Sequence, residues 1–142
     1  MLKRRSLVMT IHVVLRWLAG LFFCLAGINH FLKPDFYEQL VPPLLPSPNI
    51  LVIVSGIAEI AGGLGLLIPS MRRLAGWGLI ALLIAVFPAN IYMVVHPERF
   101  EIAPWLLWTR LPLQVAFVVW VWWVALWHSH PQRGLRVTNS NR

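Results

Sequence analysis

The chain has 142 residues, of which 58% are hydrophobic and only 12% are charged. Soluble domains carry about 25% charged residues, so the composition predicts a membrane protein. The net charge is +7, but the basic residues lie at the edges of apolar runs, and membrane topology explains them better than nucleic-acid binding does. The single cysteine, Cys24, excludes an internal disulfide and a dithiol exchange site within this chain.

Four apolar windows are long enough to cross a bilayer, which needs about 20 mainly apolar residues. They cover about residues 10–32, 49–68, 74–95 and 105–127. The amino terminus is basic like that of a signal peptide, but its apolar run is too long and contains Arg16, so we expect a retained first span. The sequence therefore predicts an all-α fold, a four-transmembrane-helix bundle that forms a single integral membrane domain over residues 1–142.

Lysine and arginine predict the orientation of the bundle, because cytoplasmic connections are enriched in them. Only Lys33 and Arg99 lie in the connections on one side of the spans. The other side receives Lys3, Arg4, Arg5, Arg72, Arg73, Arg133, Arg136 and Arg142. We therefore expect both termini in the cytoplasm, with residues 128–142 as a cytoplasmic tail.

The connection between the first two predicted spans reads KPDFYEQLVPPLLPSP. Asp35 and Glu38 are three residues apart, as in a capping box. The apolar residues of one helical face would be Phe36, Tyr37, Leu40 and Val41. Because the prolines that follow cannot continue a helix, we predict a short interfacial helix and a proline-rich loop over the outer mouth of the bundle. The alternative is an ordinary prolyl turn with no role as a lid.

Glu59 is the one acidic residue inside a predicted span. Helical spacing places it on a face of small and polar residues, which should contact protein and not lipid. A charge at the bilayer centre costs at least ~2.5 kcal/mol, and pairing is the usual remedy. Measured along the membrane normal, Arg16 and Arg110 lie at similar distances from Glu59, so either is a candidate partner. The pair would be a structural lock or part of a proton relay, and a third alternative is a neutral, protonated Glu59.

Four further polar residues fall in the outer half of the predicted bundle. His30 ends the first span, Asn90 follows Pro88 in the third, and Arg110 and Gln114 lie one turn apart in the fourth. A quinone site needs an apolar slot with a few hydrogen-bond donors, so these four residues form a candidate quinone pocket. The structural alternatives are headgroup contacts for His30 and Arg110, and repair of the Pro88 kink by Asn90.

Several sequence blocks occur in an order that resembles the DoxX family of small bacterial four-helix membrane proteins. They are GINHFLKPDFYEQLVPPLLP, SGIAEIAGGLGLLIPSMRRLAGWG, VFPANIYM and LWTRLPLQ, and the resemblance covers roughly residues 12–127. It implies a bundle in the bacterial plasma membrane with an arginine in the first helix, here Arg16, and a glutamate in the second, here Glu59. It also favours Arg16 over Arg110 as the partner of Glu59. Members of the family include membrane subunits assigned to quinone-linked sulfur oxidation.

The expected function is that of a membrane subunit or accessory of a quinone-linked oxidoreductase, in which Arg16 and Glu59 carry protons. The chain has no cysteine pair, flavin fingerprint or iron–sulfur spacing, so an oxidoreductase partner protein or a diffusible substrate would supply electrons. One alternative is a transporter or carrier for a small solute or lipid that acts as a homo-oligomer. Another is an interaction subunit without chemistry. Quinone binding by purified protein and solute movement in liposomes separate the first two hypotheses.

The sequence predicts no covalently bound cofactor, no metal site and no nucleic-acid partner. A haem held by two histidines would need His30 and His96 to face each other, and His96 precedes Pro97 in a predicted loop. His128 and His130 are spaced for a metal but lack further ligands. The expected partners are therefore the lipid bilayer, a quinone and an oxidoreductase protein.

Overall fold

The computed structural model describes residues 2–127, with side chains described from residue 7 onward. Its four long helices are α1 (Leu2–Leu32), α3 (Pro48–Leu67), α4 (Arg72–Val95) and α5 (Pro104–Ala125). The connections hold the short helix α2 (Pro34–Gln39) and the 3-10 helix η1 (Pro97–Arg99). The part of the chain that the structure describes has no strand, and all four long helices are apolar and long enough to span a membrane. The predicted all-α four-helix bundle is confirmed.

The ends of the predicted spans agree with the helices to within two residues for α3, α4 and α5. The exception is α1, which begins at Leu2, whereas its membrane-compatible part is Leu7–Leu32. The added first turns contain lysine and arginine, which are good helix formers and extend the helix beyond its apolar part. The predicted tail, residues 128–142, lies outside the described residues.

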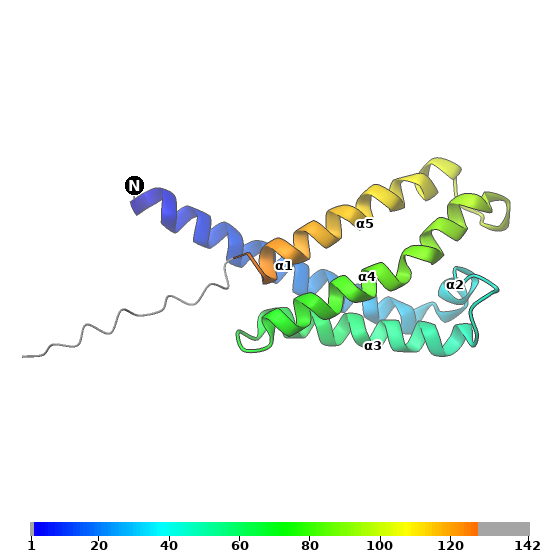
Figure 1. Cartoon of the computed structure of the whole chain (residues 1–142), viewed down its shortest axis with the longest axis horizontal. Coiled ribbons are helices and arrows are strands. Elements are labelled where there is room, and N and C mark those ends of the chain that lie inside the picture. Colours follow the sequence, from blue (N-terminus) through cyan, green and yellow to red (C-terminus); the bar gives the residue numbers. More distant parts are fainter. Residues whose placement is uncertain (1, 128–142) are drawn as a thin grey trace, which may run out of the picture.

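The long helices form two antiparallel pairs, α1 with α3 and α4 with α5 (Figure 1). The pairs lie close together toward the turn between α3 and α4, residues 68–71, and diverge toward α2 (Figure 1). These two ends of the bundle are called the turn end and the α2 end below.

The apolar core reflects this shape. Its main cluster lies in the half next to the turn end and draws on all four long helices: Ala19, Phe23, Leu66, Leu79, Ile80, Val121, Val124 and Ala125. At the α2 end the buried cluster is smaller and consists of Leu40, Met93 and Leu107. The turn half therefore holds the bundle together, and the α2 half is the place where polar groups and cavities are accommodated.

Glycines bring the backbones of α1 and α3 into direct contact. A Cβ atom added at Gly63 would lie 2.7 Å from the carbonyl oxygen of Gly20, and one added at Gly27 would lie 2.6 Å from that of Gly56. The two contacts are seven residues apart on each helix, so they repeat on one face. Small residues allow this approach in lipid, where packing drives helix association. The two contacts fix the register of α1 along α3.

Helical spacing places Ser55, Gly56, Glu59, Gly62 and Gly63 on the predicted small and polar face of the second span, and its glycines contact protein. Gly56 and Gly63 face α1, and Gly62 faces α4, where an added Cβ would lie 2.5 Å from the side chain of Leu79. The glycines of α3 therefore serve two helix contacts, because this helix lies between α1 and α4.

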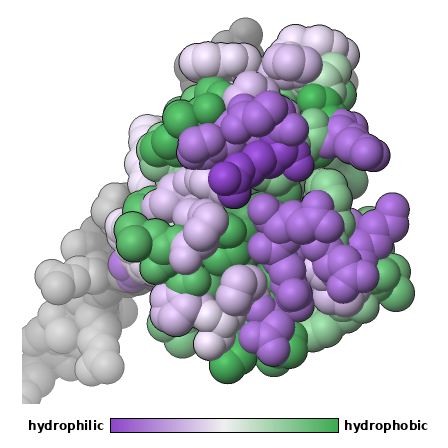
Figure 2. All heavy atoms as spheres, turned by 90° about the vertical axis from the view of Figure 1, so that its right-hand side faces the viewer, coloured by the Kyte–Doolittle hydropathy of each residue, from purple (hydrophilic) through white to green (hydrophobic). Residues whose placement is uncertain are grey.

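The surface suits a membrane protein. Large apolar side chains are exposed along all four long helices, for example Leu21, Ile53, Ile84 and Val115. Figure 2 looks onto the α2 end, where hydrophilic residues gather with apolar side chains around them. The exposed charged residues of the connections at this end are Lys33, Asp35, Glu98, Arg99 and Glu101. This distribution fits an end that meets water at the membrane boundary.

The structure confirms the predicted short helix between the first two spans, but the start of this helix differs from the prediction. The helix begins at Pro34, its N-cap is Lys33, and no side chain caps it. Asp35 is therefore already inside the first turn, so Asp35 and Glu38 do not form a capping box. Proline at the first helical position starts this helix instead, because its fixed backbone angle is helical and its missing donor is not needed there.

Candidate functional site

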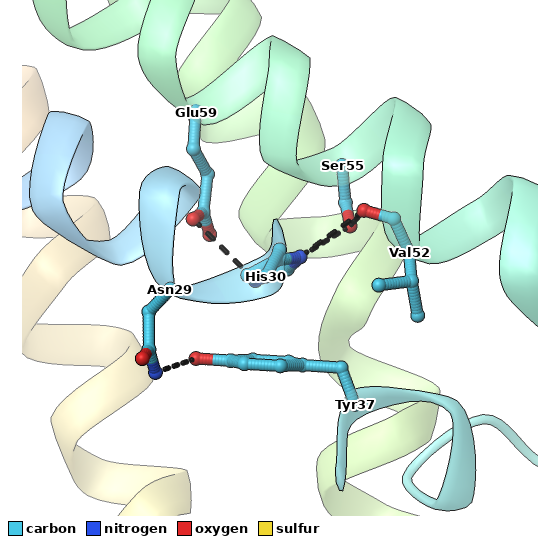
Figure 3. Close-up of polar contacts among 6 residues, drawn as sticks. All are labelled: Asn29, His30, Tyr37, Val52, Ser55 and Glu59. Atoms are coloured by element: carbon cyan, nitrogen blue, oxygen red, sulfur yellow. Dashed lines mark hydrogen bonds and ion pairs between the residues drawn. The ribbon is translucent and has the colours of Figure 1, made fainter. Parts of the chain in front are cut away.

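The polar centre of the bundle is built around His30, in the last turn of α1. The register of α1 on α3 places its ring against one face of α3 (Figure 3). The ring Nδ1 lies 3.2 Å from the carbonyl oxygen of Val52 and 3.0 Å from Oγ of Ser55. The ring Nε2 lies 3.5 Å from Oε2 of Glu59. The side chains of His30 and Glu59 are only 10% and 15% exposed, so water competes little for this contact.

The hydrogen bonds around His30 determine where its proton lies. Ser55 donates its hydroxyl to the carbonyl oxygen of Val52 at 3.0 Å, so its oxygen is free to accept from the ring. Both neighbours of Nδ1 are therefore acceptors, and Nδ1 carries a hydrogen. In the neutral ring Nε2 is then an acceptor that faces Glu59. The contact of 3.5 Å is longer than a usual hydrogen bond, and Oε2 of Glu59 has no hydrogen-bond partner among the described residues.

The side chain of Tyr37, from α2, lies against His30 on the side away from Glu59 (Figure 3). Its ring stacks on that of His30, with the centroids 3.8 Å apart and an angle of 29° between the planes. Its hydroxyl accepts a hydrogen bond of 2.9 Å from Nδ2 of Asn29. The helix α2 thus closes the polar centre at the α2 end. Sequence reasoning placed Tyr37 on the apolar face of this helix but did not connect it, or Asn29, to His30.

The structure corrects the predicted partner of Glu59. Of the described residues, His30 alone lies within ion-pair distance of its carboxyl group, and neither Arg16 nor Arg110 does. The contact of Gly20 with Gly63 explains the case of Arg16. Gly20 and Gly63 lie at the same height along the bundle. Arg16 lies about one helical turn from this level toward the turn end, and Glu59 lies about one turn from it toward the α2 end. The two residues are therefore ~12 Å apart along the helix axes. Glu59 extends away from Arg16, toward His30.

Two cavities meet at Glu59, in the space where the helix pairs diverge. The loop cavity, about 370 Å³, lies beneath α2 and the proline-rich loop. The side cavity, about 450 Å³, lies between α1 and α5. Five residues line both cavities: Ala26, Glu59, Val86, Asn90 and Arg110. The remaining lining is mostly apolar, so the polar groups in these cavities are few.

The four residues of the candidate quinone pocket lie around these cavities. His30 lines the loop cavity, Gln114 lines the side cavity, and Asn90 and Arg110 line both. Arg110 is half-buried and makes no hydrogen bond or ion pair with any described residue. Its guanidinium has five donors and no acceptor, so it is suited to an oxygen atom of a ligand.

Gln114 is buried and joins α5 to α4. Its Nε2 donates to the carbonyl oxygen of Leu83, and its Oε1 accepts a bond of 2.8 Å from Nδ2 of Asn90. The carbonyl of Leu83 adjoins that of Ile84, which loses its helical donor to Pro88. Gln114 therefore has a structural role near Pro88. Sequence reasoning had considered Asn90 for this role, as the residue that repairs the kink at Pro88. The side-chain oxygen of Asn90 keeps no protein donor in the described part of the chain.

The histidines considered for haem are not brought together. His96 Nδ1 lies 3.4 Å from Oε1 of Glu98, and its ring packs on Tyr92 with centroids 4.8 Å apart. His30 is held by α3 instead. Among the described residues there is no group of three or more metal-ligating side chains of the His, Cys, Asp and Glu types. His128 and His130 lie outside the described residues.

The comparison with protein families identifies the chain at the family level. A family model described as a domain of unknown function (DUF8561) matches residues 18–125. The chain belongs to this family. The DUF8561 segment contains the His30–Glu59 pair and every residue that lines the two cavities, whereas Arg16 lies just before it. No curated protein and no solved structure matches the chain.

Replacing Gln114 by alanine should destabilise the DUF8561 segment by about 1–3 kcal/mol, because the carbonyl of Leu83 and the amide of Asn90 lose their partner. Unfolding of the purified protein in mixed micelles measures the change. The matched control is Val115→Ala, since Val115 is the next residue and its side chain is 60% exposed. If both variants lose the same free energy of unfolding, the Gln114 hydrogen bonds between α5 and α4 do not contribute to stability.

Proposed function

We propose that the protein is a quinone-binding membrane subunit or accessory of an oxidoreductase system, in which the His30–Glu59 pair exchanges a proton with the bound quinone. The observation that carries this proposal is the shared cavity lining. The buried His30–Glu59 pair and the Arg110 guanidinium, which has no partner among the described residues, line the same cavity, whose walls are otherwise mostly apolar. Pockets for small ligands combine these features.

The dimensions of the cavities suit an aromatic ring with an apolar tail. The loop cavity, at about 370 Å³, lies within the range of ~300–1,000 Å³ that is usual for small-ligand sites. Small residues of α4, Ala85 and Ala89, form one wall and leave room for a flat ring. The side cavity is lined by Phe22, Leu106 and Phe117, among others, and offers an apolar path for a tail.

The polar groups have complementary roles in this proposal. Reduction of a quinone to a quinol takes up two electrons and two protons. Arg110 would donate hydrogen bonds to one ring oxygen and stabilise negative charge on it after electron transfer. Glu59 would deliver one proton from its carboxyl group, because it lines the cavity and His30 lies behind it. A partner oxidoreductase or a diffusible donor would supply the electrons.

The proposed location is the bacterial plasma membrane, with both termini in the cytoplasm. It is supported by the excess of lysine and arginine in the connections at the turn end and in both terminal segments. The resemblance to the DoxX family points to the same membrane. In this orientation the two cavities open in the outer half of the bilayer, where a quinone diffuses among the lipids.

Substituting Arg110 by glutamine should weaken quinone binding by about tenfold or more, because a charge-assisted hydrogen bond contributes about 1.5–3 kcal/mol. Binding of a short-chain ubiquinone or menaquinone analogue to the purified protein measures this. The control is Arg73→Gln, which removes the same charge from an exposed position next to the turn. An unchanged affinity in the Arg110 variant, or an equal loss in both variants, would refute the proposed site.

A further inference from the structure

The amide groups between α5 and α4 fix which atoms of the cavity wall donate hydrogen bonds and which accept them. The series begins at the carbonyl oxygen of Leu83, which can only accept. Gln114 must therefore present its amino group to Leu83, and its side-chain oxygen turns to Asn90. Asn90 in turn must donate with Nδ2, over 2.8 Å. The orientation of the Asn90 amide thus follows from a backbone carbonyl that cannot reverse its role.

The acceptor that this series leaves over is Oδ1 of Asn90. It has no donor among the described residues, and Asn90 lines both cavities. Glu59 adds a second acceptor to the same walls, because its Oε2 is buried and has no hydrogen-bond partner in the described part of the chain. An amide oxygen accepts at every pH, so the need for a donor at Asn90 does not depend on the protonation of Glu59. A ligand that covers these atoms without donating to them loses affinity.

Arg110 supplies the opposite function on the same wall. It lies one helical turn from Gln114, ~6 Å along the axis of α5, and Gln114 holds the amide of Asn90. The guanidinium has donors only, and no described residue accepts from it. The cavity wall therefore suits a ligand group that accepts from Arg110 and donates to Asn90. A hydroxyl group does both, whereas a carbonyl oxygen only accepts.

We infer that the cavities bind the hydroquinone form of a quinone more tightly than the oxidised form. This inference rests on the proposed function and names the redox form that the site selects. Both forms can accept from Arg110, but only the quinol has hydroxyl hydrogens for Asn90 and Glu59. Sites that hydrogen-bond a ligand hydroxyl discriminate against the analogue that lacks it, because their own polar groups are then left unpaired. Asn90 is therefore a specificity-determining residue of the site.

Tighter binding of the quinol has a redox consequence. The quinone becomes the quinol by taking up two electrons and two protons, and the partner oxidoreductase or diffusible donor of the proposed function supplies the electrons. A tenfold preference for the quinol raises the midpoint potential of the bound two-electron couple by about 30 mV relative to the free couple. The site thereby favours reduction of the quinone, the direction in which Glu59 delivers a proton.

The test is an anaerobic binding titration of the purified full chain in neutral detergent with three related ligands. They are a short-chain benzoquinone, its quinol and the dimethyl ether of that quinol. The quinol should bind about tenfold more tightly than the quinone. The dimethyl ether keeps both oxygens but has no hydroxyl hydrogen, so it should bind no more tightly than the quinone.

This ligand series needs no variant and separates two kinds of failure. The inference is overturned, and the quinone site stands, if the quinone or the dimethyl ether binds as tightly as the quinol. If none of the three ligands binds, the proposed quinone site fails as well.

An Asn90→Leu variant tests whether Asn90 determines the preference. Leucine has a similar size but no acceptor, so the ratio of the quinone to the quinol dissociation constant should fall about fivefold. A general loss of affinity cancels in this ratio, because both constants are measured on the same variant. The control is Asn49→Leu, the same change at an exposed position that lines neither cavity, and it should keep the wild-type ratio. Equal ratios in the two folded variants would overturn the role of Asn90.

Discussion

Replacing Gly63 by alanine should destabilise the protein by about 2 kcal/mol, because the new methyl group has no space between α1 and α3. Its carbon would lie 2.7 Å from the carbonyl oxygen of Gly20 and 2.9 Å from Sγ of Cys24. The carbonyl belongs to a helix backbone and cannot turn aside, so the helices must separate. The register of α1 on α3 also sets the His30–Glu59 distance, so the variant should lose ligand affinity as well.

The control for this experiment is Gly78→Ala. Gly78 is likewise inside a long helix, but a Cβ added there meets nothing within 4 Å. Alanine is the better helix former by roughly 0.5–1 kcal/mol, so this variant should be as stable as the wild type or slightly more stable. Unfolding in mixed micelles compares the two. A Gly63 variant as stable as the Gly78 variant would mean that close contact of α1 with α3 does not hold the bundle together.

Substitution of Glu59 by glutamine should leave the fold nearly intact and slow proton delivery. Glutamine has the same size, and its amide can donate to Nε2 of His30, so we expect a stability change within about 1 kcal/mol. It cannot release a proton to a ligand. Proton uptake that accompanies chemical reduction of a bound quinone should therefore slow by about a hundredfold, the usual order for a lost general acid.

A pH-indicator dye follows this proton uptake after a rapid addition of reductant. Glu101→Gln is the matched control, since Glu101 is exposed in the connection before α5 and lines neither cavity. It should take up protons at the wild-type rate. If the Glu59 and Glu101 variants behave alike while both remain folded, the His30–Glu59 pair has a structural role only.

The sequence alone was sufficient for the architecture. The thickness of a bilayer sets the length of an apolar helix, so four windows predicted α1, α3, α4 and α5, with small errors at the ends of all but α1, whose basic first turns precede its apolar part. The short helix α2 was predicted from its apolar face, although its start depends on Pro34 and not on Asp35.

The pairing within the site could not be predicted in the same way. Depth in the membrane left Arg16 and Arg110 equivalent as partners of Glu59, because depth does not determine which residues of two helices face each other. The contacts of Gly20 with Gly63 and of Gly27 with Gly56 determine this. A sequence shows that these glycines are small but not which of them meet.

The roles of the two amide side chains also needed tertiary structure. Asn90 and Gln114 were both placed in the candidate pocket, yet most of the hydrogen bonds of Gln114 go to α4. The carbonyl of Leu83, next to the one that Pro88 leaves without a donor, is reached by Gln114 of α5, which lies 24 residues farther along the chain than Asn90. Helical spacing within one span contains no information on such a contact.

Photolabelling tests the central claim most directly, namely that a quinone occupies the cavities that meet at Glu59. An azido-quinone analogue is bound to the purified protein, illuminated, and located by mass spectrometry with and without excess unlabelled quinone. We predict labels on α4 between Leu82 and Asn90 and on α2 or its following loop at Leu40–Pro42, and excess quinone should suppress them. Labels confined to membrane-facing residues outside both cavities, or labels that excess quinone does not reduce, would contradict the proposed site.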